Sequence, residues 1–265
     1  MVASNQGISI ILNLFHGVVA NAALGIANQI NGAMYNFVSN FQLAFNPQIV
    51  QSYALKDYEA HKEIILGTSK YSFFLMAIIS APILYFTHSI LILWLGDKVP
   101  TYAEGFVQVI ILCSLIDALA GPFWMSATAI GTMKEYNIVL TLINFCILPL
   151  AYFLMKYGYN PVYAFYGKLV IYIIMQLFRF YFVDRYLKFK RKDLLFYLFA
   201  VGLIFIYLLI LIVFNRISIT YNLFQVTLGT LMLEVILLIL IFSLGLASRE
   251  RNWVINFVKS KLKLK

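Results

Sequence analysis

The sequence predicts an all-α membrane protein, a polytopic bundle of about eight transmembrane helices. Of its 265 residues, 62% are hydrophobic and 12% are charged, whereas soluble domains contain roughly 25% charged residues. The apolar residues lie in runs of about 20, the length that a helix needs to cross the ~30 Å hydrocarbon core of a bilayer. The loops between these runs are short, so no separate soluble domain is expected.

Composition also excludes other classes of protein. A disordered chain has few aromatic residues, and here they make up 17%. Two cysteines cannot build a disulfide scaffold. A nucleic-acid-binding domain would share the net charge of +9 but not the hydrophobicity. The expected surroundings are therefore a lipid bilayer, with no nucleic-acid partner and with the excess positive charge in the loops.

The first two segments differ from the ordinary spans that follow them. Gly7–Phe15 is apolar but too short to cross the bilayer alone, so it is expected to be a truncated first helix. Asn21–Val50 is a long helical stretch rich in asparagine. Six clear spans follow: Tyr71–Leu95, Phe106–Ile130, Asn137–Met155, Tyr163–Val183, Leu194–Phe214 and Leu223–Leu246.

Lysine and arginine predict the orientation of the chain. Lys98, Lys156 and Arg216 stand alone in their loops. The alternate loops and the tail hold most of the others: Lys56, Lys62, Lys70, Lys134, Arg185, Lys188, Lys190, Arg191, Lys192, Arg249, Arg251, Lys259, Lys261, Lys263 and Lys265. Because basic loops stay on the cytoplasmic side, the C-terminus is predicted to be cytoplasmic.

The C-terminal tail, residues 248–265, allows two interpretations. Trp253, Phe257 and Val258 can share one side of a helix while lysines occupy much of the rest. This pattern is typical of a basic amphipathic helix lying on the inner leaflet. The alternative is a frayed positive tail that only sets the topology.

Uncharged amides are concentrated in Asn21–Val50, which is otherwise apolar. At 100° per residue they all fall in one half of the helix, around a line of small residues formed by Gly25, Gly32 and Ser39. The amides are Asn21, Asn28, Gln29, Asn31, Asn36, Asn40, Gln42 and Asn46. Such a face predicts either the wall of a hydrated pathway, in which amides suit sugars, or hydrogen bonds between closely packed helices.

The opposite half of this helix is apolar and is expected to meet lipid or other helices. It consists of Ala23, Ile26, Ile30, Ala33, Phe37, Phe41 and Ala44. Pro47 is expected to kink the end of the helix, because it cannot donate a backbone hydrogen bond.

Four ionisable residues lie inside the predicted spans. Asp117 and Glu234 stand near the middle of theirs, where a charge is costly, and are candidates for coupling transport to an ion. Their alternative role is that of neutral acids hydrogen-bonded to another helix. Lys168 and Arg179 lie nearer the ends of Tyr163–Val183, where they either snorkel to the interface or anchor a phosphate group.

No catalytic or cofactor motif is present. Cys113 and Cys146 are isolated, and the three histidines are scattered, so no metal site is predicted. The chain also lacks a phosphate-binding glycine loop with its lysine and a Gly-x-Ser-x-Gly motif. These observations predict a protein that is not an enzyme and that binds no cofactor.

Several stretches carry a resemblance to a known family: Gln6–Phe15, Ala20–Ala33, Phe37–Gln42, Asn46–Val50 and Asp117–Pro122 with Ala127–Gly131. They resemble the second half of bacterial polysaccharide-unit flippases, in the superfamily that also contains the MATE multidrug exporters and the peptidoglycan-lipid flippases. The resemblance covers roughly Gln6–Val183. It implies a second helical bundle over residues 1–183, two additional helices over 184–247 and the tail over 248–265. Such proteins usually have twelve or fourteen spans, so the chain is expected to be the C-terminal part of a longer transporter or a short relative.

The resemblance implies that undecaprenyl-pyrophosphate-linked oligosaccharides are flipped across the bacterial inner membrane by alternating access, for O-antigen or capsule assembly. The amide face and the charges inside the spans, rather than the resemblance, assign the substrate pathway to Asn21, Asn28, Gln29, Asn36, Asn40, Lys168 and Arg179, and ion coupling to Asp117 and Glu234. A polysaccharide polymerase and glycosyltransferases are the implied protein partners, and an N-terminal half or a second copy is needed to enclose a cavity. The alternatives are a cation-coupled exporter of small organic molecules and a membrane scaffold that does not transport.

Overall fold

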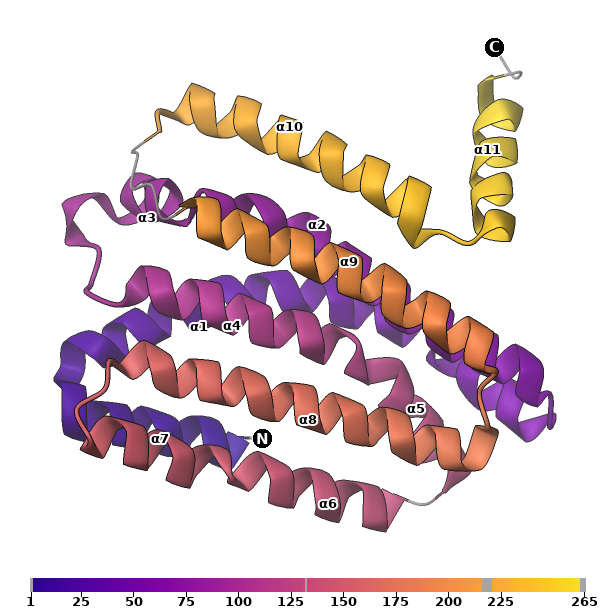
Figure 1. Cartoon of the computed structure of the whole chain (residues 1–265), viewed down its shortest axis with the longest axis horizontal. Helices are drawn as coiled ribbons and strands as arrows, with labels where there is room; N and C mark the ends of the chain where they lie inside the picture. Colours follow the sequence, from indigo (N-terminus) through magenta and orange to yellow (C-terminus); the bar gives the residue numbers. More distant parts are fainter. Residues whose placement is uncertain (1, 132, 216–220, 263–265) are drawn as a thin grey trace.

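A computed structural model describes residues 2–131, 133–215 and 221–262 of the chain, and within them every regular element is helical. Seven of these helical stretches are long and apolar enough to cross a membrane, which confirms the predicted polytopic all-α fold (Figure 1). The helices are α1 Val2–Ala54, α2 Tyr58–Tyr85, α3 Thr87–Leu95, α4 Ala103–Ala118, α5 Ala120–Ile130, α6 Met133–Phe145, α7 Ile147–Lys156, α8 Pro161–Leu187, α9 Arg191–Asn215, α10 Leu223–Leu240 and α11 Ser248–Leu262.

Helix α1 contains both of the unusual N-terminal segments. Gly17, with φ 73° and ψ −171°, interrupts its helical geometry, and this backbone conformation is essentially restricted to glycine. Figure 1 shows that the chain turns back on itself at this end of α1, so that a short first arm is followed by a long second arm. The two arms contain, in order, the short apolar segment Gly7–Phe15 and the amide-rich segment Asn21–Val50.

The second predicted span begins earlier than its hydropathy indicates. Helix α2 starts at Tyr58 rather than Tyr71, because the Asp57 side chain caps it by accepting a hydrogen bond from the Ala60 N–H at 3.1 Å. Hydropathy detects only the apolar part of a helix, whereas the cap determines where the helix itself begins. Helix α3 then follows after a break at Phe86.

Two other predicted spans are also interrupted. The span around Asp117 divides at Leu119 into α4 and α5, three residues before Pro122, and the next divides at Cys146 into α6 and α7. Pro122 explains the first break, since proline cannot donate a hydrogen bond to the carbonyl one turn earlier. This break lies beside the candidate site described below.

The helices are arranged around α4, which is buried along most of its length among α1, α2 and α8. Helix α9 packs against α2, and α10 lies on the outside of the bundle (Figure 1). The loops that carry most of the basic residues, between α1 and α2 and between α8 and α9, lie at the same end as the junction of α10 and α11. Arg216, Lys263 and Lys265, which enter the orientation argument, lie outside the described residues.

Candidate functional site

A pocket of about 500 Å³ lies among α1, α5, α6 and α8, at the end of α4. Its walls are largely apolar, with a smaller number of polar groups, which is the usual composition of a ligand site of this size. The polar lining consists of Tyr35, Ser39, Gln42, Asp117, Tyr136, Asn137, Thr141, Asn144 and Arg179.

An ion pair forms part of the lining of this pocket. Arg179 Nη1 lies 3.6 Å from Asp117 Oδ1, which is too long for a hydrogen bond. Arg179 is only 4% exposed, and the Tyr35 hydroxyl lies beside the carboxylate of Asp117. Within the described part of the chain, Arg179 Nη1 makes no hydrogen bond, and the Tyr136 hydroxyl lies beside the same guanidinium. The buried guanidinium therefore keeps hydrogen-bonding capacity at a lined pocket.

Lys168 extends this charged region along α8. It lies eleven residues before Arg179, so the two cations share one face of the helix about three turns apart. Its Nζ donates to Asn5 Oδ1 at 3.2 Å and lies 5.4 Å from the centre of the Tyr172 ring. Lys168 is 9% exposed, and it interacts electrostatically with Asp117. The region thus holds two basic side chains and one acidic side chain.

Snorkelling is therefore the wrong interpretation for both Lys168 and Arg179. Their position near the ends of a span made it reasonable, but their side chains lie in the interior because they face the bundle and find polar partners there. Glu234 lies apart from this group, half-buried on the outer helix α10 beside Tyr207. The structure brings together three of the four ionisable residues selected from the sequence.

The break between α4 and α5 is stabilised by side chains from other helices. Gln42 is buried, and its Nε2 donates to the Ala118 carbonyl at 2.8 Å. Pro122, one turn later, has no N–H to give to this oxygen. A side chain at Gly121 would collide with the Gln42 amide, so this glycine makes the close approach possible. The break next to Asp117 is held open by a hydrogen bond from α1.

A second contact supports the same break from α2 and α9. Ser69 Oγ donates to the Leu119 carbonyl at 2.9 Å and also hydrogen-bonds the Tyr197 hydroxyl at 2.8 Å. Because Tyr197 lies on α9, the predicted additional C-terminal helices are connected to the break beside the ion pair.

Seven of the eight amides selected on α1 divide into two groups, and the eighth, Asn46, is half-buried. Asn21 Oδ1 accepts a hydrogen bond from Ser9 at 2.8 Å, Asn31 Oδ1 accepts one from Ser114, and Gln42 donates to the Ala118 carbonyl as described. These three make the interhelical bonds of one sequence interpretation. The others on the candidate list, Asn28, Gln29, Asn36 and Asn40, are exposed, so the alternative interpretation stays open for them.

The exposed amides lie on the same uncovered face as Gly25 and Gly32, which have no neighbouring atom near the position of a Cβ. Ser39 and Leu43 lie on this face too and line the pocket, so the face and the pocket are continuous. In the opposite, apolar half, Ala23 is buried against other helices, whereas Phe37 is 66% exposed and so is available for contact with lipid.

Sequence reasoning missed the contribution of α6. Asn137, Thr141 and Asn144 follow one another at helical spacing and line the pocket, and Asn144 also donates to the Ser4 hydroxyl. This polar stripe in an apolar span was visible in the sequence. Tyr35 was also missed, although it falls within the amide half of α1.

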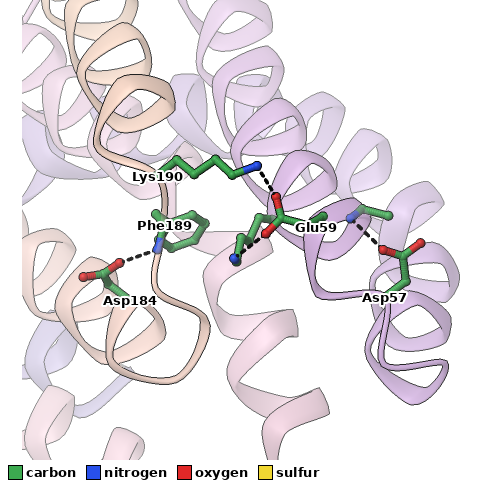
Figure 2. A network of polar contacts seen from close by, with 7 residues as sticks. Asp57, Glu59, Asp184, Phe189 and Lys190 are labelled. Carbon is green, nitrogen blue, oxygen red and sulfur yellow. Dashed lines mark hydrogen bonds and ion pairs between the residues drawn. The ribbon is translucent and has the colours of Figure 1, made fainter.

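A polar network joins two connections at the basic end of the bundle (Figure 2). Glu59 accepts from Lys62 at 2.8 Å and pairs with Lys190 at 2.5 Å, and this hydrogen bond raises the pKa of the Lys190 ammonium. Asp184 Oδ1 accepts from the Phe189 N–H at 2.8 Å. The start of α2 is thereby tied to the connection between α8 and α9. Because the side chains of Glu59 and Lys190 are exposed, the network orders this end more than it stabilises the fold.

Together, the spans, the break in α4–α5 and the lined pocket define a multi-pass membrane protein with a polar site inside its helical bundle. The family model MatE matches residues 2–153. The chain belongs to the MatE family, whose members are membrane transporters rather than enzymes. No curated protein and no solved structure matches the chain. The matched region includes Asp117 but ends before Lys168 and Arg179.

Proposed function

We propose that this chain forms the second helical bundle of a flippase for undecaprenyl-pyrophosphate-linked oligosaccharides. The observation that carries the proposal is the buried guanidinium of Arg179 at the edge of a lined pocket, where its Nη1 makes no hydrogen bond and meets Asp117 only at 3.6 Å. Arginine binds phosphate oxygens through its planar fork of N–H groups. A pocket with such a donor suits an anionic cargo.

The balance of charge supports an anion over an organic cation. Asp117 is already paired with Arg179, and Lys168 adds a second positive charge on the same face of α8. An exporter of cations needs an acid that is free to bind its substrate. Here the acid is the minority charge, so a pyrophosphate finds the more favourable field.

The exposed amides on α1 support a glycan as the rest of the cargo. Asn28, Gln29, Asn36 and Asn40 present donors and acceptors without charge, and Trp124 at the pocket offers an apolar ring face on which a sugar can lie. Exposing amides to hydrocarbon is unfavourable. This face therefore suits a hydrated cavity that is completed by an N-terminal bundle or by a second copy of the chain.

The break at Leu119 suggests how such a site would move. In alternating access, one bundle rocks against the other around a fixed binding site. Pyrophosphate binding to Arg179 would weaken the pairing of Arg179 with Asp117, which would leave the carboxylate to take a proton or a cation. Because Asp117 directly precedes the break, its change of partner is placed to alter the angle between α4 and α5.

The remaining parts of the proposal concern location and partners. Residues 1–183 would form the bundle, 184–247 two additional helices and 248–265 a cytoplasmic tail. The protein would lie in the bacterial inner membrane and serve O-antigen or capsule assembly beside glycosyltransferases and a polysaccharide polymerase. The one-sided distribution of Lys and Arg supports a cytoplasmic C-terminus.

A cation-coupled exporter of small organic molecules is the second candidate, because the MatE match includes Asp117. Thermal unfolding of the purified protein, measured with inorganic pyrophosphate and separately with tetraphenylphosphonium, distinguishes the two candidates. Inorganic pyrophosphate is expected to raise the unfolding temperature of the wild type but not of Arg179→Gln. Arg185→Gln, an exposed arginine on the same helix, is the matched control and should keep the response.

Two other results would contradict the flippase. Stabilisation by tetraphenylphosphonium but not by pyrophosphate would favour the cation exporter, and no response to either would favour a membrane scaffold. Transport itself is tested in proteoliposomes containing a lipid-linked oligosaccharide. The flippase is expected to move the glycan out of reach of an impermeant lectin, and Asn36→Leu with Asn28→Leu should slow this movement.

A further inference from the structure

Helix α11 leaves the bundle at its basic end. Helix α10 finishes in a π-helical turn at Ile241–Gly245, and the chain is extended at Leu246 before α11 begins. Figure 1 shows α11 running across the direction of α9 and α10 and ending beyond them. Since the long helices run along the membrane normal, α11 lies roughly in the plane of the membrane surface.

Glu250 fixes the beginning of α11 to the bundle. Its carboxylate accepts from Lys70 Nζ at 2.7 and 2.8 Å and from the Tyr71 hydroxyl at 2.6 Å. It also accepts from the Ala247 N–H at 2.6 Å, which is the contact that a glutamate makes in the first turn of a capped helix. One carboxylate therefore caps α11 and attaches it to α2.

Lys70 is a suitable partner because it is itself held in place. Its side chain is 5% exposed, and its ammonium lies 5.1 Å from the centre of the Tyr71 ring and 5.2 Å from that of Phe196 on α9. Burial alone would raise the pKa of Glu250, but the hydrogen bonds from Lys70 and Tyr71 outweigh it and hold this pKa below its ordinary value. The attachment is thus a specific ion pair that fixes the direction in which α11 faces.

The face of α11 that carries Glu250 also carries its aromatic residues. Trp253 and Phe257 follow at helical spacing, their rings stack with centres 5.6 Å apart, and they are 67% and 51% exposed. Because Glu250 turns this face toward the membrane-embedded part of α2, the two rings point to the bilayer side. Tryptophan and phenylalanine in such a position are typical of helices that lie in a membrane interface.

Basic and polar residues occupy the flanks and the far side of α11. At 100° per residue, Arg249 lies next to the aromatic face on one side and Arg251 lies beyond its other side, while Lys259 lies on the far side of the helix with Asn252 and Asn256. Long basic side chains at the flanks can reach lipid phosphates while their stems cover apolar surface. Their charge is complementary to a leaflet that contains anionic lipids.

We propose that α11 is a membrane-surface helix that binds anionic lipid headgroups through Arg249, Arg251 and Lys259, with Trp253 and Phe257 inserted among the acyl chains and Glu250 fixing it to α2. The partner is the bilayer itself. This binding surface is separate from the polar pocket, so the proposal does not depend on which cargo the transporter moves.

The experiment follows Trp253 fluorescence in the full chain, with Trp94→Phe and Trp124→Phe so that Trp253 is the remaining tryptophan. The protein is reconstituted into phosphatidylcholine vesicles with or without phosphatidylglycerol. With phosphatidylglycerol, quenching by lipids brominated on their acyl chains should be strong and quenching by aqueous acrylamide weak. Replacing Arg249, Arg251 and Lys259 by glutamine should abolish this difference, since each basic residue contributes roughly a fivefold preference for an anionic surface.

Two controls and two contrary results complete the test. Lys98→Gln, in a loop at the opposite end of the bundle, should leave the quenching unchanged. Glu250→Gln should release α11 from α2 and broaden the depth distribution of Trp253 without removing the lipid preference.

Acrylamide quenching that is equally strong in both kinds of vesicle would show a helix in water and overturn the proposal. Equal bromolipid quenching without phosphatidylglycerol would overturn the role of the anionic headgroups. Neither readout depends on transport.

Discussion

The hydrogen bond from Gln42 to the Ala118 carbonyl leads to a quantitative prediction for Gln42→Met. Methionine has nearly the same length and fills the same space, so the change mainly removes the Nε2 donor that lies 2.8 Å from the carbonyl oxygen. The site is buried, and Pro122 cannot supply a backbone donor in its place. The substitution therefore leaves a buried acceptor without its partner.

The expected loss follows from the cost of that acceptor. An unsatisfied buried group costs about 1–3 kcal/mol, whereas hydrogen bonds between membrane helices average ~0.6 kcal/mol because the surroundings relax. Since the break at Leu119 is also held by Ser69, some relaxation is restricted, and we expect Gln42→Met to lower the free energy of unfolding by about 1–2 kcal/mol.

The assay is reversible unfolding in mixed micelles, followed by circular dichroism as the fraction of denaturing detergent rises. Gln29→Met is the matched control, because this amide is exposed on the same helix and its loss should cost less than about 0.5 kcal/mol. If Gln42→Met is no more costly than Gln29→Met, the proposed support of the break is refuted.

A double-mutant cycle isolates the contact. Gly121→Ala places a methyl group against the Gln42 amide, and overpacking of this kind costs about 1–3 kcal/mol. In a Gln42→Ala background the collision is removed, so Gly121→Ala should cost less by at least about 0.5 kcal/mol. Additive effects would show that the two side chains do not meet.

Three further predictions concern other parts of the molecule. The hydrogen bond from Lys70 lowers the pKa of Glu250 in the folded state, so the contribution of Glu250 to attaching α11 is present above the ordinary pKa of 4.5 and is lost as pH falls through the lower folded pKa. Limited proteolysis of the tail should therefore increase only at such acidic pH. Glu250→Gln should remove this pH dependence. Gly245→Val would press against the Phe74 ring and should lower unfolding stability by about 1–3 kcal/mol, a loss that Phe74→Ala in the same chain should partly relieve if this contact is the cause. Asn36→Leu should leave unfolding stability within about 0.5 kcal/mol of the wild type, since the side chain is exposed, while reducing glycan translocation; a large loss of stability would instead assign Asn36 to packing.

Much of the fold could be predicted because membrane spans obey a simple physical rule. A run of apolar residues as long as the bilayer is thick has few alternatives to a helix, and the six clear spans of the sequence are all helical. What could not be predicted was where helices extend or break. The start of α2 at Tyr58 depends on the Asp57 cap. The break at Cys146 lies three residues before Pro149, the same spacing as between Leu119 and Pro122, but hydropathy alone does not reveal it.

The candidate site was predictable in its residue types but not in its partners. Asp117 and Arg179 were selected separately, because each is costly inside a membrane. Their pairing joins α4 to α8 and depends on packing that no local pattern encodes. The same packing places Lys168 and Arg179 in the interior rather than at the interface, where the sequence allowed either position, and it places Glu234 on the outer helix beside Tyr207.

The sequence by itself determined that this protein crosses a membrane several times, that its basic loops share one end, and that one helix carries an unusual number of amides. These properties follow from hydropathy, charge and helical period, which act within a single segment. Only the tertiary structure decided which amides bond to other helices and which stay exposed, and which charges meet. The physical reason is that each of these outcomes depends on the rotation of one helix relative to its neighbours, and that rotation is set by packing between segments far apart in the chain.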